Sequence, residues 1–95
     1  MPAILRLGDP ISCGDRMANG SSSVFANGIP VSRVGIDLTA GHCFTPVPII
    51  TGSPNVFANG VPVARTGDSI AVHCCPDHGC HSGVGAGGSP NVNAN

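Results

Sequence analysis

The sequence predicts a single small all-β domain made of three copies of one unit, arranged as a closed ring. Residues 53–68 (SPNVFANGVPVARTGD) repeat residues 21–35 (SSSVFANGIPVSRVG) almost position by position. A third copy is divided between the chain ends: residues 89–95 (SPNVNAN) carry its first half and residues 2–9 (PAILRLGD) its second half. Because an open repeat array has distinct end caps, ends that complete one unit indicate a ring with approximate three-fold symmetry.

Composition favours one domain without helices, spanning residues 1–95. Its repeat units cover about residues 21–52, 53–88, and 89–95 completed by 1–20. Fourteen Gly and nine Pro interrupt every candidate helix. A core with three Phe and no Trp or Tyr is marginal at this size, so we expect a metal, disulfides or a partner to support it. A net charge of −1 excludes the basic surface of a nucleic-acid-binding protein.

Each unit is expected to contain one β-hairpin. In the first two copies, short apolar runs flank an Asn-Gly pair, at residues 24–31 and 56–63. Asn-Gly in this setting favours a type I′ turn, which needs positive φ at both central residues. We assign the Asn-Gly pairs to turn formation alone. In the third copy the expected strands come from opposite chain ends, residues 92–94 and 2–4.

The five Cys and four His all lie in the loops that follow the hairpins. Loop one (residues 9–20) contains Cys13, and loop two (36–52) contains His42 and Cys43. Loop three (68–88) contains the other six, namely His73, Cys74, Cys75, His78, Cys80 and His81. In a ring the three loops leave on one side, so these side chains should converge near the axis. No signal peptide opens the chain, so we expect reduced thiols, which favours metal ligands over disulfides.

These features resemble the PAAR-repeat family, named for a Pro-Ala-Ala-Arg motif. The motif positions read PVAR at 62–65, PVSR at 30–33 and, more loosely, PAILR at 2–6, while residues 75–79 (CPDHG) are similar to the family's Cys-Pro-x-His-Gly loop. The resemblance covers essentially the whole chain. It implies a sharp cone of short β-strands and hairpins with one zinc ion near the vertex.

The resemblance also implies a function. Family members form the distal tip of the trimeric β-helical spike in type VI secretion systems and contractile phage tails. One chain would dock its wide base on each trimeric, VgrG-type spike protein and sharpen it for mechanical puncture of a target membrane, with effector proteins as further partners. We expect cytoplasmic assembly followed by export on the spike tip. We expect no catalytic residues and no effector activity of the chain's own, since almost nothing lies outside the three units.

A closed zinc site takes four N or S ligands, and position selects among nine candidates. Cys13 and His81 each stand eight residues before the Ser that opens the next hairpin, while His42 and His78 stand eleven before it. Counted forward from the Asp of each unit, His73 matches His42 instead. The resemblance supports His78, and the family's habit of three His and one Cys favours a His in the fourth place. We predict Cys13, His42, His78 and His81 as ligands, with His73 and Cys75 as alternates for the fourth.

The other chemistry-bearing residues are expected to be structural. We expect Cys43, Cys74 and Cys80 to be buried as small apolar side chains or linked by a disulfide. Arg6, Arg33 and Arg65 should pair with an Asp or with backbone carbonyls between repeats.

Two other function classes remain open at this point. A small zinc metalloenzyme would keep three protein ligands and an open position for water, but the chain has no Glu to act as general base. A secreted, disulfide-stapled binding module would show an oxidised framework and no metal. Metal analysis with a free-thiol count distinguishes all three.

Overall fold

The computed structural model describes residues 2–41, 46–76 and 79–95. Within these ranges the chain forms strands, bridges, turns and bends and no helix, so none that could cross a membrane. This confirms the all-β class. The strands form three two-stranded antiparallel sheets: β1 (Phe25–Ala26) with β2 (Ile29–Pro30), β3 (Phe57–Ala58) with β4 (Val61–Pro62), and β5 (His73–Cys75) with β6 (Gly79–His81).

The first two hairpins form at the Asn-Gly pairs. Asn27 and Gly28 have φ of 58° and 76°, and Asn59 and Gly60 have 57° and 77°. Positive φ at both central residues is the type I′ geometry, whose twist matches that of the flanking strands. The two hairpins share one register, in which the Phe of one strand lies opposite the Pro of the other. The turn prediction is therefore confirmed.

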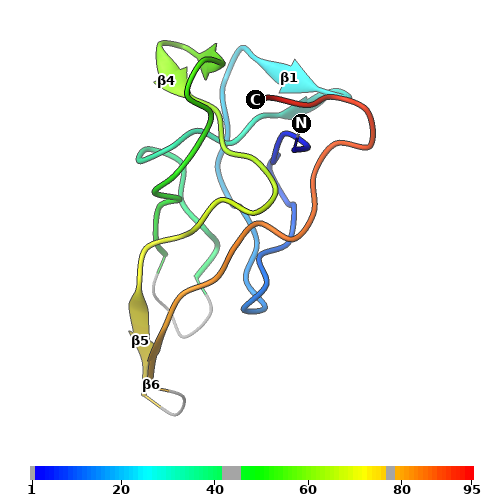
Figure 1. Cartoon of the computed structure of the whole chain (residues 1–95). Coiled ribbons are helices and arrows are strands. Elements are labelled where there is room, and N and C mark those ends of the chain that lie inside the picture. The colour runs from blue at the N-terminus through cyan, green and yellow to red at the C-terminus, as the bar shows by residue number, and fades with distance from the viewer. Residues whose placement is uncertain (1, 42–45, 77–78) are drawn as a thin grey trace.

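The two ends of the chain pair with each other. Ala3 and Asn93 form an antiparallel bridge. On either side of it, the Ile4 N–H donates to Val92 O (2.9 Å) and the Ala94 N–H donates to Pro2 O (3.0 Å). Both termini lie beside β1 in Figure 1. Residues expected as neighbouring strands from opposite chain ends are thus hydrogen-bonded.

Three backbone segments meet in a closed cycle of hydrogen bonds. The Leu5 N–H donates to Ala64 O (3.0 Å), the Ala64 N–H to Ser32 O (2.9 Å), and the Ser32 N–H to Leu5 O (2.9 Å). All three residues are 0% exposed. They stand at the same position of the three PAAR-like motifs, one residue before the Arg. Each motif segment therefore makes the same bond to its neighbour, and the three bonds close a cycle.

Apolar side chains form two buried clusters. One cluster takes one Ala and one branched residue from each of the three repeats: Ala26, Ala58, Ala94, Ile4, Val31 and Val63. A second cluster continues into the loops with Leu5, Ala64, Ile11, Ile70, Met17, Ile49 and Val47. The small residues in the first cluster allow the first two hairpins and the paired chain ends to approach one another closely.

Each motif arginine holds the turn that follows it. The Nε atom of Arg6 lies 3.0 Å from Asp9 Oδ2, and Arg33–Asp37 and Arg65–Asp68 repeat this pair at 2.8 and 2.9 Å. In each case the same carboxylate also accepts the arginine's own backbone N–H. The structural role predicted for these arginines is confirmed.

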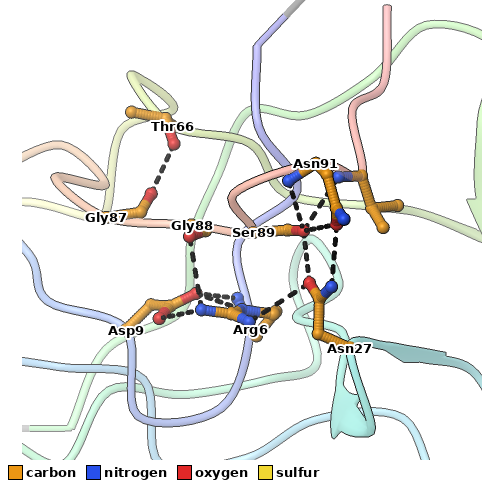
Figure 2. A network of polar contacts seen from close by, with 9 residues as sticks. Arg6, Asp9, Asn27, Thr66, Gly87, Gly88, Ser89 and Asn91 are labelled. Carbon is orange, nitrogen blue, oxygen red and sulfur yellow. Dashed lines mark hydrogen bonds and ion pairs between the residues drawn. The ribbon is translucent and has the colours of Figure 1, made fainter.

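Figure 2 shows how Arg6 also links separate segments. Its guanidinium donates to Gly88 O (3.2 Å) and to Asn27 Oδ1 (3.3 Å). Asn27 in turn accepts the Ser89 hydroxyl and donates to Asn91 Oδ1 at 2.8 Å. The assignment of the Asn-Gly pairs to turn formation alone was therefore wrong, because the amide side chain joins the first hairpin to the C-terminal segment.

The molecule narrows along its length. Its extents are 36 × 24 × 21 Å. β1 to β4 and both termini lie at the broad end in Figure 1, and the β5–β6 hairpin lies at the opposite, slender end. We call these the wide end and the narrow end.

Candidate metal centre

The β5–β6 hairpin places two histidines opposite each other. His73 pairs directly with His81, Cys74 with Cys80, and Cys75 with Gly79. Directly opposed residues of an antiparallel pair share one face, and the face alternates along the strand. The two imidazoles therefore lie together, with ring centroids 4.5 Å apart in an edge-to-face arrangement.

Loop one brings a cysteine to the same place. The segment is held against the residues that follow β6, by an Ile11–Gly85 bridge and by the Ser12 N–H donating to Val84 O (2.8 Å). A turn closes at Gly14, whose φ is 97°. A Cβ at position 83 would lie 3.2 Å from the Cys13 Cβ, so glycine there permits the close approach. Cys13 is thus positioned by backbone contacts on both sides.

Cys13, His73 and His81 form one group whose candidate ligand atoms all lie within 4.8 Å of one another. Tetrahedral zinc bound by N and S holds its ligand atoms about 3.3–3.8 Å apart, so a modest side-chain adjustment would meet that requirement. Two imidazoles and a thiolate are the donors that zinc prefers. The residues present therefore fit a zinc ion.

A backbone carbonyl sets the tautomer of the buried histidine. His73 Nδ1 lies 3.2 Å from Ala71 O. A carbonyl can only accept, so Nδ1 carries the proton and Nε2 keeps its lone pair. Metal-binding histidines are commonly oriented by such a bond from the other ring nitrogen. This contact, which the sequence did not indicate, leaves Nε2 as the atom of His73 that can bind a metal.

The predicted ligands divide into three groups. Cys13 and His81 lie together, and they are joined by His73, which was only an alternate for the fourth place. His42 and His78 fall outside the described residues, so their assignment stays a prediction. The sulfur of Cys75, the other alternate, lies 3.9 Å from His81 Nε2, but it is disulfide-bonded and offers no thiolate.

Cys74 and Cys80 form a disulfide across the hairpin. This is one of the two states expected for this pair. Their side chains lie on the face opposite His73 and His81, since the pairs alternate along the strands. The disulfide and the candidate metal centre are therefore consecutive rungs of one hairpin.

Comparison with known proteins identifies the family to which the chain belongs. Residues 44–95 match the model of the PAAR motif, while a search of curated proteins found no significant match. The motif is that of spike-tip proteins of contractile injection systems, which are structural components rather than enzymes. The match extends over just over half of the chain, and the chain therefore belongs to the PAAR motif family.

Proposed function

We propose that this protein caps the blunt end of a trimeric, VgrG-type spike and gives it a sharp tip for puncturing a target membrane. It would assemble in the cytoplasm and leave the cell on the spike of a type VI secretion system or a related phage-tail-like machine, with effectors as further cargo. The observation that carries the proposal is the closed cycle of Leu5, Ser32 and Ala64. It gives one chain three similar segments around a common centre, which is what a single cap on a trimer requires.

The wide end is the proposed docking surface. Phe25 on β1 and Phe57 on β3 are 53% and 54% exposed. They are equivalent by repeat, and Asn93 takes their place in the C-terminal copy. Large exposed apolar side chains that recur at equivalent positions are typical of interaction sites. The narrow end, by contrast, carries the exposed disulfide hairpin and would point away from the spike.

We further propose that Cys13, His73 and His81 hold one zinc ion together with a fourth ligand, for which His42 and His78 are the candidates from the sequence. Bound zinc would tie loop one to the β5–β6 hairpin. Metal binding would then contribute directly to folding, since the ligands come together only in the folded chain.

Docking can be tested with a soluble trimeric fragment of the distal end of a VgrG-type spike. Light scattering on the co-purified complex should give one chain per trimer. The double variant Phe25→Ser/Phe57→Ser should weaken binding at least about tenfold, because each loses contact area worth roughly 1 kcal/mol or more. Val72→Ser is the matched control, since Val72 is also exposed but directly precedes β5. Three chains per trimer, or equal losses in both variants, would contradict the proposal.

The metal can be tested by elemental analysis of the purified protein. We expect about one zinc per chain, as a closed four-ligand site requires. His73→Ala and His81→Ala should each lower zinc content and melting temperature together, whereas Val72→Ser should change neither. A parent protein of full stability that contains no zinc would refute this part.

A further inference from the structure

We propose that the Cys74–Cys80 disulfide is a redox lock on the metal-bearing hairpin, open under reducing conditions and closed under oxidising ones. In the closed state it holds His73 opposite His81 and so slows the loss of zinc. The inference rests on the zinc site of the proposed function, and adds to it a control by the redox state of the surroundings.

The geometry of the hairpin supports the lock. β5 and β6 are three residues long each, and the disulfide joins their central pair. The His73–His81 pair is the adjacent rung. Sliding one strand by a single residue would move its side chain to the opposite face, which would separate the imidazoles. A covalent bond at the next rung forbids that slip.

The hairpin has few apolar contacts and depends on cross-links, of which the disulfide bond of Cys75 in β5 is a second one. Isolated two-stranded hairpins of this length are marginal in water. Among the described residues, neither apolar cluster includes a member of β5 or β6. Cross-links act most strongly where the surrounding packing is weak, because they remove conformations that packing does not exclude. The register of this segment therefore depends on its cross-links.

The disulfide between Cys74 and Cys80 is accessible to thiols and disulfides in solution. Cys74 and Cys80 are exposed, whereas His73 is buried on the other face. An oxidant can therefore reach the sulfurs without entering the metal centre. Thiols stay reduced in the cytoplasm and oxidise outside it, so export of the protein would itself provide the change of conditions.

The chemistry is thiol–disulfide exchange with a disulfide oxidant such as glutathione disulfide. The thiolate of one cysteine attacks a sulfur of the oxidant, breaks its S–S bond and releases one glutathione thiolate. The second cysteine then attacks the protein sulfur of the mixed disulfide, forms the Cys74–Cys80 bond and releases the second thiolate. Two electrons pass from the cysteines to the oxidant, and the two thiol protons pass to the released thiolates.

The experiment measures zinc release and hairpin opening in both redox states. Zinc-loaded full-length protein is equilibrated in oxidised or reduced glutathione, and its thiols are counted. Zinc transfer to a chromogenic chelator is then followed. We expect release to be about tenfold faster after reduction, and up to about 50-fold faster, which is the loop-closure effect for a loop of this length. Amide hydrogen exchange in β5 and β6 of the metal-free protein should accelerate likewise.

The double variant Cys74→Ser/Cys80→Ser removes this one bond and leaves the other cysteines unchanged. In oxidised glutathione it should release zinc faster than the parent, while Val72→Ser should keep the redox response of the parent. Equal release from the oxidised and reduced parent, both loaded with zinc, would overturn the lock and leave the proposed function standing. Failure of both states to take up zinc would overturn the lock together with the zinc site. A double variant that releases zinc as slowly as the oxidised parent in oxidised glutathione would also overturn it, since the disulfide of Cys75 would then be sufficient.

Discussion

Deleting residues 89–95 should remove most of the free energy of unfolding, although chain ends are usually the most dispensable part of a domain. The deletion breaks three backbone hydrogen bonds between the two ends: Ile4 N–H to Val92 O, Ser89 N–H to Ile4 O, and Ala94 N–H to Pro2 O. At about 1 kcal/mol each, these bonds contribute about 3 kcal/mol.

The deleted segment also buries apolar surface at the wide end. Ala94 is 1% exposed, and the partly buried Val92 packs on the same cluster. Together their burial contributes about 2 kcal/mol. The total loss of about 5 kcal/mol compares with the 5–10 kcal/mol typical of small domains. At roughly 4–8 °C per kcal/mol, the melting temperature should fall by at least about 20 °C.

A pair of point variants keeps this prediction testable if the truncated chain does not fold. Ala94→Asp places an unpaired carboxylate at a buried position and should cost about 2–4 kcal/mol. Asn93→Asp adds the same charge at the neighbouring exposed position and should change stability by less than about 0.5 kcal/mol. The measurement is a thermal melt of each protein with zinc present. A truncated chain that melts within a few degrees of the parent, or an Ala94→Asp variant as stable as Asn93→Asp, would show that the pairing of the two ends does not support the fold.

Three further predictions concern single residues. The Ser32 hydroxyl is buried without a hydrogen-bond partner, and Ala64 fills the equivalent position, so Ser32→Ala should stabilise the protein by about 1 kcal/mol in denaturant unfolding; a loss would contradict this. Burial alone would raise the pKa of Asp68, but hydrogen bonds from Arg65 and a threonine hydroxyl outweigh it and hold the pKa below its ordinary value. The ionised carboxylate then stabilises the fold above about pH 4 and loses this effect as it protonates. Asp68→Asn should therefore have a lower free energy of unfolding than the parent at pH 7, and this difference should shrink below about pH 4. A difference that does not change with pH would refute the stabilising role of the ionised carboxylate. Gly52→Ala would place a Cβ 2.7 Å from a backbone oxygen and should lower the free energy of unfolding by about 2–3 kcal/mol. A thermal melt of the variant would detect this loss. An unchanged melting temperature would show that the backbone can move to accommodate the added methyl group.

The hairpins at the wide end could be predicted because their signals are local. The Asn-Gly pairs specify the turn, and the neighbouring apolar residues specify the strands. The pairing of residues 2–4 with residues 92–94 could be predicted from the repeats, since each chain end carries one half of the third repeat unit. In both cases a short stretch of sequence carries the whole signal.

The β5–β6 hairpin was missed because it lacks those signals. It has neither an Asn-Gly turn nor alternating apolar residues, so the sequence predicts a loop over residues 68–88. Position counts then gave His81 and His73 as competing candidates, whereas they are neighbours on one face. A signal was present in the mirrored order of residues 73–75 (HCC) and 79–81 (GCH). In an antiparallel pair the residue order of one strand runs opposite to that of the other, so a sequence whose second segment mirrors the first is compatible with such pairing.

The different restraints at the two ends follow from the taper of the molecule. At the wide end one apolar cluster supplies burial, and the cycle of Leu5, Ser32 and Ala64 and a second cluster that continues into the loops supply hydrogen bonds and further burial. At the narrow end the cross-section leaves too little interior for apolar side chains, and a small core cannot reach it. Cross-links can act there because they need no interior volume. The group of Cys13, His73 and His81 begins where Cys13 meets the second apolar cluster, and the disulfide lies on the opposite, exposed face of the β5–β6 hairpin. A tip that must resist axial force would need them at that point.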